Sequence, residues 1–419
     1  MAQEKDNQII TVCHPICCGL DVHKDMISAC LISVAESGED YTEIREFRSF
    51  TADLQCLRDW LLEKCCPIVA MESTGVYWRP VHNVLEDVVQ VILVNARHIK
   101  NLPGKKTDIA DSKWLAGLLR HGLLKGSFIP PEFVRDWRDL TRMRKGIQEH
   151  LADYKRRIHK LFESANIKLG SVLSDIFGVT GRRLMQLLIA RSTDITLEDI
   201  EICMQGPLKS NSHDVLQAIK GFFREHHRYM LEKYLRLITN LEQEVVDLDQ
   251  RLTMLMESYH SQLQRLEAIP GISTTSARLI LSEIGPTLDQ FPSSAAFASW
   301  CGLCPGNNQS AGKRRSGRSP VHRHRLKEIM IEVAWSAIRK KGSYYKEKFY
   351  RLRSRLGPKK ALVAVAHRLL KAIYHVIKYQ EEFRDLGENY LLMLHQSRKV
   401  AYLKKQAQVL GYELIPVTS

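Results

Sequence analysis

The first part of the chain, residues 14 to about 125, alternates short apolar runs with helix-like segments. The apolar positions predict strands at Ile16–Val22, Met26–Val34, Tyr41–Phe50, Pro67–Met71 and Val88–Asn95. A helix is expected to begin at a Thr51 cap, a second lies between the last two strands, and a third spans Lys106–His121. This order of elements is typical of an α/β domain with a mixed sheet.

Two long amphipathic helices are predicted in the next region, residues 133 to about 262. The apolar stripe of the first comprises Leu140, Met143, Ile147, Leu151, Tyr154, Ile158 and Leu161. The second has a heptad seam from Tyr234 to Leu255. The pair could form a hairpin within one chain or a coiled coil between chains. The segment between them, about 170 to 225, is expected to be mostly helical, and no role can be assigned to it.

A third region, residues 263 to about 380, is predicted to be mainly α-helical. It opens with the turn IPGIS, and helices are expected at Thr274–Ile284, near 326–340 and at 358–378. The turn could present backbone amides to phosphate or could be a plain connection between helices. A loop rich in Gly, Asn, Ser and Arg is expected from Gly302 to Arg318. Residues 385–419 form a tail with one more helix.

Charge narrows the choice of partners. The 419 residues carry 61 Lys and Arg against 47 Asp and Glu, a net charge of +14. This excess favours nucleic acid as a partner, with an anionic membrane surface second and a merely basic globular protein as the alternative. No apolar run is long enough to span a bilayer, and the polar N-terminus favours a cytoplasmic location.

The 10 cysteines fall at irregular spacings, so we expect free thiols. Two groups could bind a metal: Cys13, Cys17 and Cys18 with His14, and the pair Cys301 and Cys304. A zinc site usually needs two well-separated pairs, so a structural role is the preferred interpretation of both groups.

Four carboxylates in the first region could form a catalytic metal site. Asp21 sits near the end of the first strand in GLDVHKD, and Glu72 follows the fourth in MESTGVYW. Asp108 and Asp111 in KKTDIADSKWLA are spaced to share one helix face. Carboxylates that converge repel one another, and a divalent ion such as Mg²⁺ relieves this repulsion.

Each of these acids also has an ordinary interpretation. Asp108 and Asp111 could lie on a solvated helix face, and Glu72 could serve at a helix entry. Asp21 could be a turn residue, with Asp25 as a rival for its role. Their order along a basic chain favours the functional interpretation.

A serine in the basic loop is a candidate nucleophile. The segment PGNNQSAGKRRSGRSPVHRHRLK contains Ser310 and the cations Lys313, Arg314, Arg315 and Arg318 but no acid. A serine hydroxyl can attack a phosphodiester and hold one strand covalently, and nearby guanidinium groups can stabilise the developing charge. Ser310 could instead be a phosphate contact, and Ser316 and Ser319 are equally available. Tyr344 and Tyr345 fit core packing better than nucleophilic attack.

Together these segments resemble the DEDD transposases of insertion sequences related to the Piv DNA invertase. The resemblance covers roughly residues 14–125 and 263–380. It implies an α/β RuvC-like N-terminal domain with an RNase H fold, a helical coiled-coil region at 133–262 and a mainly α-helical transposase domain at 263–380. The tail at 385–419 lies outside the resemblance.

The resemblance also implies roles for residues. Asp21, Glu72, Asp108 and Asp111 would be the metal-binding acids and Ser310 the nucleophile of a Mg²⁺-dependent DNA recombinase. Donor and target DNA, a structured bridge RNA that pairs with both, and further copies of the chain in a dimer or tetramer would be the partners. Two alternatives stay open: a RuvC-like hydrolytic endonuclease without a covalent intermediate, and a non-catalytic nucleic-acid-binding protein.

Overall fold

The computed structural model describes residues 12–34, 40–73, 75–95, 108–191, 195–204, 211–305, 308–310, 313–316 and 324–415. For residues 108–110, 308–310 and 313–316 it describes the backbone alone. The chain forms two compact units, Met1–Ile129 and Pro130–Ser419. Each is considered by itself, and the domain limits expected from the sequence remain a prediction.

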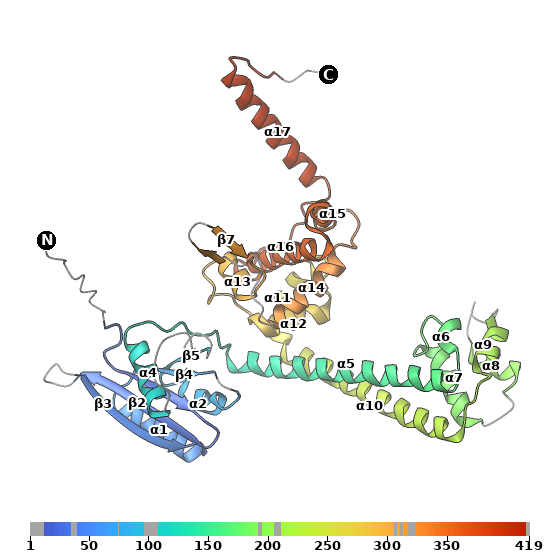
Figure 1. Ribbon diagram of the computed structural model, residues 1–419, viewed down its shortest axis with the longest axis horizontal. Coiled ribbons are helices and arrows are strands. Elements are labelled where there is room, and N and C mark those ends of the chain that lie inside the picture. The colour runs from blue at the N-terminus through green and yellow to red at the C-terminus, as the bar shows by residue number, and fades with distance from the viewer. Residues whose placement is uncertain are drawn as a thin grey trace. The chain divides into compact units, whose positions relative to one another are not determined.

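The first unit is built on a five-stranded mixed sheet (Figure 1). Its strands are β1 (Cys17–Val22), β2 (Met26–Val34), β3 (Asp40–Arg48), β4 (Ile68–Glu72) and β5 (Gln90–Val94), in the order β3-β2-β1-β4-β5. The first three strands pair antiparallel, and β4 lies parallel to both β1 and β5. All five strands were predicted, so the α/β fold class is confirmed for this unit.

Helices cover both faces of this sheet, as the apolar content of its central strands requires. On one face pack α1 (Thr51–Glu63) and α2 (Trp78–Leu85), whose Leu57 and Leu85 are fully buried. On the other lies α4 (Asp108–Arg120), whose Ala116 and Leu119 contact a small apolar cluster of the sheet. The expected Thr51 cap is wrong by one residue: Phe50 is the N-cap, without a side-chain hydrogen bond, and Thr51 begins the helix.

The second unit begins with two long helices that pack antiparallel along each other (Figure 1). These are α5 (Glu132–Ser164) and α10 (Glu225–Leu255), and Arg144 of α5 makes a two-pronged ion pair with Asp249 of α10, at 2.8 Å for both contacts. The two long helices therefore pair with each other as a hairpin within one chain. A supercoiled seam stays a prediction.

One member of the predicted apolar stripe is misplaced. Met143 is 55% exposed, whereas Arg144 beside it is buried against Asp249. The ion pair satisfies the buried guanidinium, which explains why a charged residue occupies the inner position.

Four short helices lie at the far end of the hairpin: α6 (Leu169–Val172), α7 (Val179–Ala190), α8 (Leu197–Cys203) and α9 (Ser212–Ile219). They share a core with Ile158 of α5 and Ile238 of α10. The segment to which the sequence assigned no role therefore closes the end of the hairpin.

The remainder is helical and shares one large core. It comprises a short 3-10 turn at Glu257–Tyr259, α11 (His260–Glu267), α12 (Thr274–Ile284), α13 (Ser294–Trp300), α14 (Arg325–Ala337), α15 (Tyr344–Leu356), α16 (Pro358–Lys378) and α17 (Tyr390–Val409). The mainly helical prediction is confirmed, and Tyr344 and Tyr345 are buried in the core as expected.

The IPGIS turn between α11 and α12 has a packing role. Gly271 has a φ of +87°, and a Cβ there would overlap the Val333 carbonyl and the Ala337 amide of α14. Only glycine permits both the backbone angle and this close approach.

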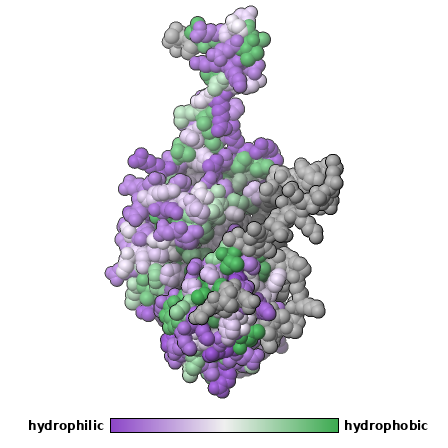
Figure 2. Space-filling model, turned by 90° about the vertical axis from the view of Figure 1, so that its left-hand side faces the viewer, coloured by the Kyte–Doolittle hydropathy of each residue, from purple (hydrophilic) through white to green (hydrophobic). Residues whose placement is uncertain are grey.

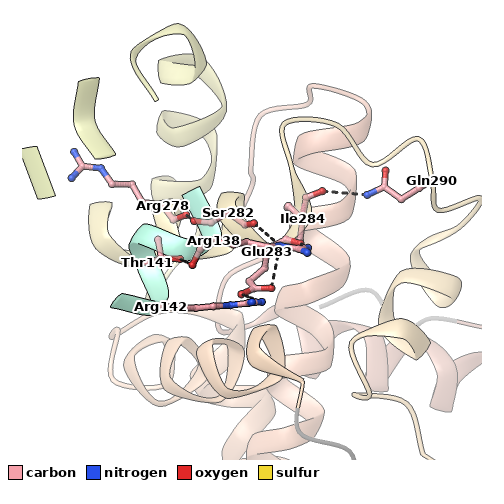
Figure 3. Close-up of polar contacts among 8 residues, drawn as sticks. All are labelled: Arg138, Thr141, Arg142, Arg278, Ser282, Glu283, Ile284 and Gln290. Carbon is pink, nitrogen blue, oxygen red and sulfur yellow. Dashed lines mark hydrogen bonds and ion pairs between the residues drawn. The ribbon is translucent and has the colours of Figure 1, made fainter. Parts of the chain in front are cut away.

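A buried carboxylate fixes α12 to the long helix α5 (Figure 3). Glu283 of α12 lies 3.6 Å from Nε of Arg138 and 3.7 Å from a guanidinium nitrogen of Arg142. Arg138 also donates to the carbonyls of Ser282 and Glu283. The base of the hairpin and the C-terminal core are thereby held as one unit.

Candidate active site

Strand register places two of the predicted acids at neighbouring strand ends. β1 and β4 run parallel, with Leu20 opposite Met71. One residue further along each strand stand Asp21 and Glu72, both partly buried. The carboxyl ends of parallel strands are where α/β sheets usually carry their sites.

Both acids also lie on the same face of the sheet. Two positions before Asp21, Gly19 packs against α4, since a Cβ there would overlap the Ser112 carbonyl and the Ala116 amide. Two positions before Glu72, Ala70 belongs to the cluster that contacts Ala116. Because side chains alternate along a strand, Asp21 and Glu72 face the α4 side.

The first turns of α4 lie over this part of the sheet. Ser112 is fully buried, and its Oγ is 3.2 Å from Oγ of Ser28. Ser28 is the residue opposite Asp21 in the β1–β2 ladder. Asp111, next to Ser112, is partly buried. Asp108 is the first residue of α4, and its side chain lies outside the described part of the chain.

His23 is a partner of Asp21. Its Nε2 lies 3.1 Å from Asp21 Oδ2, and the side chains are 55% and 14% exposed respectively. An imidazole at this distance orients the carboxylate and stabilises its negative charge when protonated. The rival acid Asp25 is exposed in the β1–β2 turn.

Sequence reasoning missed the residues that position the acids. Gly19 lies within GLDVHKD, one alternation before Asp21, and a glycine inside a strand is a sign of close backbone approach. Ser28 and Ser112 gave no signal, because nothing in a single sequence indicates that residues 84 apart form a hydrogen bond.

The donor set fits a hard divalent cation. Carboxylate oxygens are the ligands that Mg²⁺ prefers. Among the side chains that the structure describes, no three His, Cys, Asp or Glu residues gather closely enough to hold a metal ion. Asp108 is outside that comparison, so the four-acid site remains a proposal.

The segment around Ser310 differs from the loop that the sequence predicted. β6 (Asn308–Ser310) and β7 (Lys313–Ser316) form a small antiparallel sheet, with Ser310 opposite Lys313 and Gln309 opposite Arg314. Its polar and charged strands lack the apolar alternation by which strands are recognised. The side chains of Ser310, Lys313, Arg314 and Arg315, and Arg318 as a whole, lie outside the described part.

This hairpin follows a well-anchored element. α13 packs on α16, and Cys301 and Leu303, between α13 and β6, are buried in the large core. Burial raises the pKa of the Cys301 thiol to about 12, which keeps it protonated and favours the structural interpretation.

Comparison with known proteins gives a consistent result. Residues 18–167 match the DEDD domain of IS110 elements, described as "Transposase", and residues 263–351 match the family described as "Transposase IS116/IS110/IS902". Over 147 residues the chain is 27% identical to "Putative transposase y4pF/y4sB" of Sinorhizobium fredii (strain NBRC 101917 / NGR234). That match covers 34% of this chain and 38% of the relative.

On the face shown in Figure 2, hydrophilic side chains predominate and hydrophobic ones form small separate patches. Within the described ranges, none of the helices is both long and apolar enough to cross a bilayer.

Proposed function

We propose that this chain is an insertion-sequence transposase of the IS110 family, whose two domain models it matches, and that it cleaves and rejoins DNA by a metal-assisted, covalent serine mechanism. The DEDD domain of this family is RuvC-like, in agreement with the five-stranded sheet of the first unit. The matched segments together cover more than half of the chain and occur in the expected order.

The observation that carries the proposal is the shared position of Asp21 and Glu72. Asp21 is the last residue but one of β1 and Glu72 is the last residue of the parallel strand β4, and both lie on the face that α4 covers with the residues after Asp108. Asp21, Glu72, Asp108 and Asp111 would hold Mg²⁺, which when bound supplies charge neutralisation at the scissile phosphate. His23 would keep Asp21 oriented, and the Ser28–Ser112 contact would hold α4 over the strand ends.

Ser310 is the proposed nucleophile. Its Oγ would form a bond to phosphorus while the bond to one sugar oxygen breaks, with the serine proton passing to that leaving oxygen. The phosphoserine link conserves the bond energy for rejoining, which reverses the step with a new sugar hydroxyl. Lys313, Arg314, Arg315 and Arg318 would contact the backbone and stabilise the negative charge of the transition state.

The partners we propose are donor DNA, target DNA, a structured bridge RNA and further copies of the chain. A net charge of +14 supports a polyanionic partner. The resemblance described above supports the RNA guide, the dimer or tetramer, and a site in which one subunit supplies the acids and another the serine.

A paired substitution tests the metal-binding role. Asp21→Asn should abolish cleavage of labelled donor DNA in Mg²⁺, with the flanking-region RNA present, because it removes a charged ligand. Asp25→Asn changes an exposed acid four residues away and should cleave like the wild type. Equal loss in both variants, or full activity in both, would contradict the assignment of Asp21.

A further inference from the structure

A second basic site lies away from the β6–β7 hairpin, in a cavity of 760 Å³ between α15, α16 and α17. Its walls carry Lys348, Arg351, Arg355, Arg368 and Arg398, together with His395. No aspartate or glutamate lines this cavity. Three of the five cations lie beyond residue 351, where the matched transposase segment ends.

Within the described part of the chain, none of the five cations has an acidic side chain within ion-pair distance. Arg368 also borders a neighbouring cavity that is lined by Glu381, Glu382 and Asp385, whereas the other four cations do not line that cavity. Burial, and then the repulsion of Arg368, Arg351, Arg398 and Arg355, lowers the pKa of Lys348. A protein gains no stability from like charges held together, so an anionic ligand is the natural reason for their convergence.

The cavity is a built feature, because α17 is attached at its base. Arg351 of α15 donates to the Leu391 carbonyl at 3.1 Å, and Leu391 is buried. The rings of Tyr344 and Tyr390 meet edge to face, with centroids 5.9 Å apart. The nearby Asp385 carboxylate accepts from the amides of Tyr344 and Gly387, both at 3.0 Å, and so serves as a cap.

We propose that this cavity binds phosphate groups of a nucleic-acid backbone. Five cations on three helices suit several phosphates along a strand better than a single small anion. The cationic surface continues along α17, where Arg398, Tyr402 and Lys405 recur at helical spacing and no acid lies between Tyr390 and Val409. The site's existence stands on its own geometry, and the choice of nucleic acid as ligand rests on the proposed function.

Binding as a function of salt tests this site without requiring catalysis. The probes are a labelled mixed-sequence DNA duplex and a labelled RNA hairpin, each titrated with the full chain. In the variant Arg355→Gln/Arg398→Gln, the slope of log affinity against log salt should fall by about 1 for each phosphate that the side chains no longer neutralise. The control Arg236→Gln/Arg251→Gln removes two exposed arginines of α10 and should keep the wild-type slope.

The two arms identify the source of the phosphates. A reduced slope with DNA alone assigns the cavity to DNA, and a reduced slope with RNA alone assigns it to RNA. A slope equal to that of the control with both probes overturns the proposal, even if the chain cleaves DNA normally. The two proposals can also fail separately. If the variant lowers the salt slope but the wild-type chain never becomes covalently linked to DNA, the serine mechanism is contradicted and the phosphate-binding cavity is still supported.

Unliganded stability gives a second readout. Because the substitutions relieve repulsion, the variant without nucleic acid should unfold at the wild-type temperature or above it. A clearly lower unfolding temperature would contradict the view that these arginines are uncompensated.

Discussion

At the scale of single residues, the candidate site depends on a missing side chain as much as on the acids. Gly19 lets α4 approach β1 until backbone atoms of Ser112 and Ala116 fill the space of a Cβ. The sequence indicated Asp21 and Glu72 because carboxylates near strand ends are recognisable, and Asp108 and Asp111 because their spacing places them on one helix face. The glycine inside a strand at position 19 was a sign of close approach that the prediction did not use, and nothing indicated Ser28 or Ser112, whose contact exists only once the chain is folded.

Gly19→Ala should therefore displace α4 and lower the free energy of unfolding by about 1–3 kcal/mol, the usual cost of overpacking. Gly117→Ala in α4 is the matched control, since no atom lies within 4 Å of the position that a Cβ of residue 117 would occupy. It should be neutral or stabilise by about 0.5–1 kcal/mol, as expected for glycine in a helix. Urea unfolding of the two variants measures the difference, and equal effects would contradict the close approach of β1 and α4.

The buried carboxylate of Glu283 is a second residue-scale feature. Burial lowers the pKa of Arg138, partly offset by the charge of Glu283. Glu283→Gln removes the neutralising charge and should lower the free energy of unfolding by about 3 kcal/mol. Glu267→Gln, at an exposed position of α11, should change it by less than about 0.5 kcal/mol. Thermal or urea unfolding measures both variants. Equal free energies of unfolding in the two variants would contradict a stabilising role of the Glu283 ion pairs.

At the scale of elements, hydrophobic periodicity predicted the strands and long helices well. β2, α12 and α16 have the predicted bounds, because their apolar positions alternate or recur without interruption. The β6–β7 hairpin was missed, since its residues are polar or charged and show no apolar alternation. Periodicity could not choose between an internal hairpin and pairing of chains, because both bury the same stripe.

The start of α10 predicts a pH effect on stability. The Arg224 amide donates to Nδ1 of His227 at 3.1 Å, and the histidine is buried. Burial, followed by Arg224 and His226, lowers the pKa of His227 below its ordinary 6.5. As pH falls through about 6.5, the unfolded chain takes up the proton first, so the free energy of unfolding should decrease.

His227→Asn keeps a hydrogen-bond acceptor that does not titrate, so it should flatten part of this pH dependence. Burial also lowers the pKa of His367, so the part of the pH dependence that is due to His367 should remain in this variant. His213→Asn, at an exposed position of α9, should leave the slope unchanged. Urea unfolding at several pH values compares the three proteins, and an unaltered slope in His227→Asn would contradict the role of this cap.

At the scale of the whole molecule, the chain divides at Ile129, with the acids in one unit and Ser310 in the other. The sequence predicted both sets of residues from their local motifs. Local motifs do not encode whether or how the two sets come together, because that would depend on the assembly of the units and of any further copies of the chain. We propose that residues of the two units act in one reaction.

The most direct test is covalent trapping on purified full-length protein. It is incubated with labelled donor and target DNA, Mg²⁺ and RNA transcribed from the flanking region, and separated on a denaturing gel. We expect a DNA-linked protein band that is lost in Ser310→Ala and retained in Ser316→Ala. Cleaved DNA without linked protein, at the same level in Ser310→Ala, would contradict the serine mechanism and leave a hydrolytic nuclease.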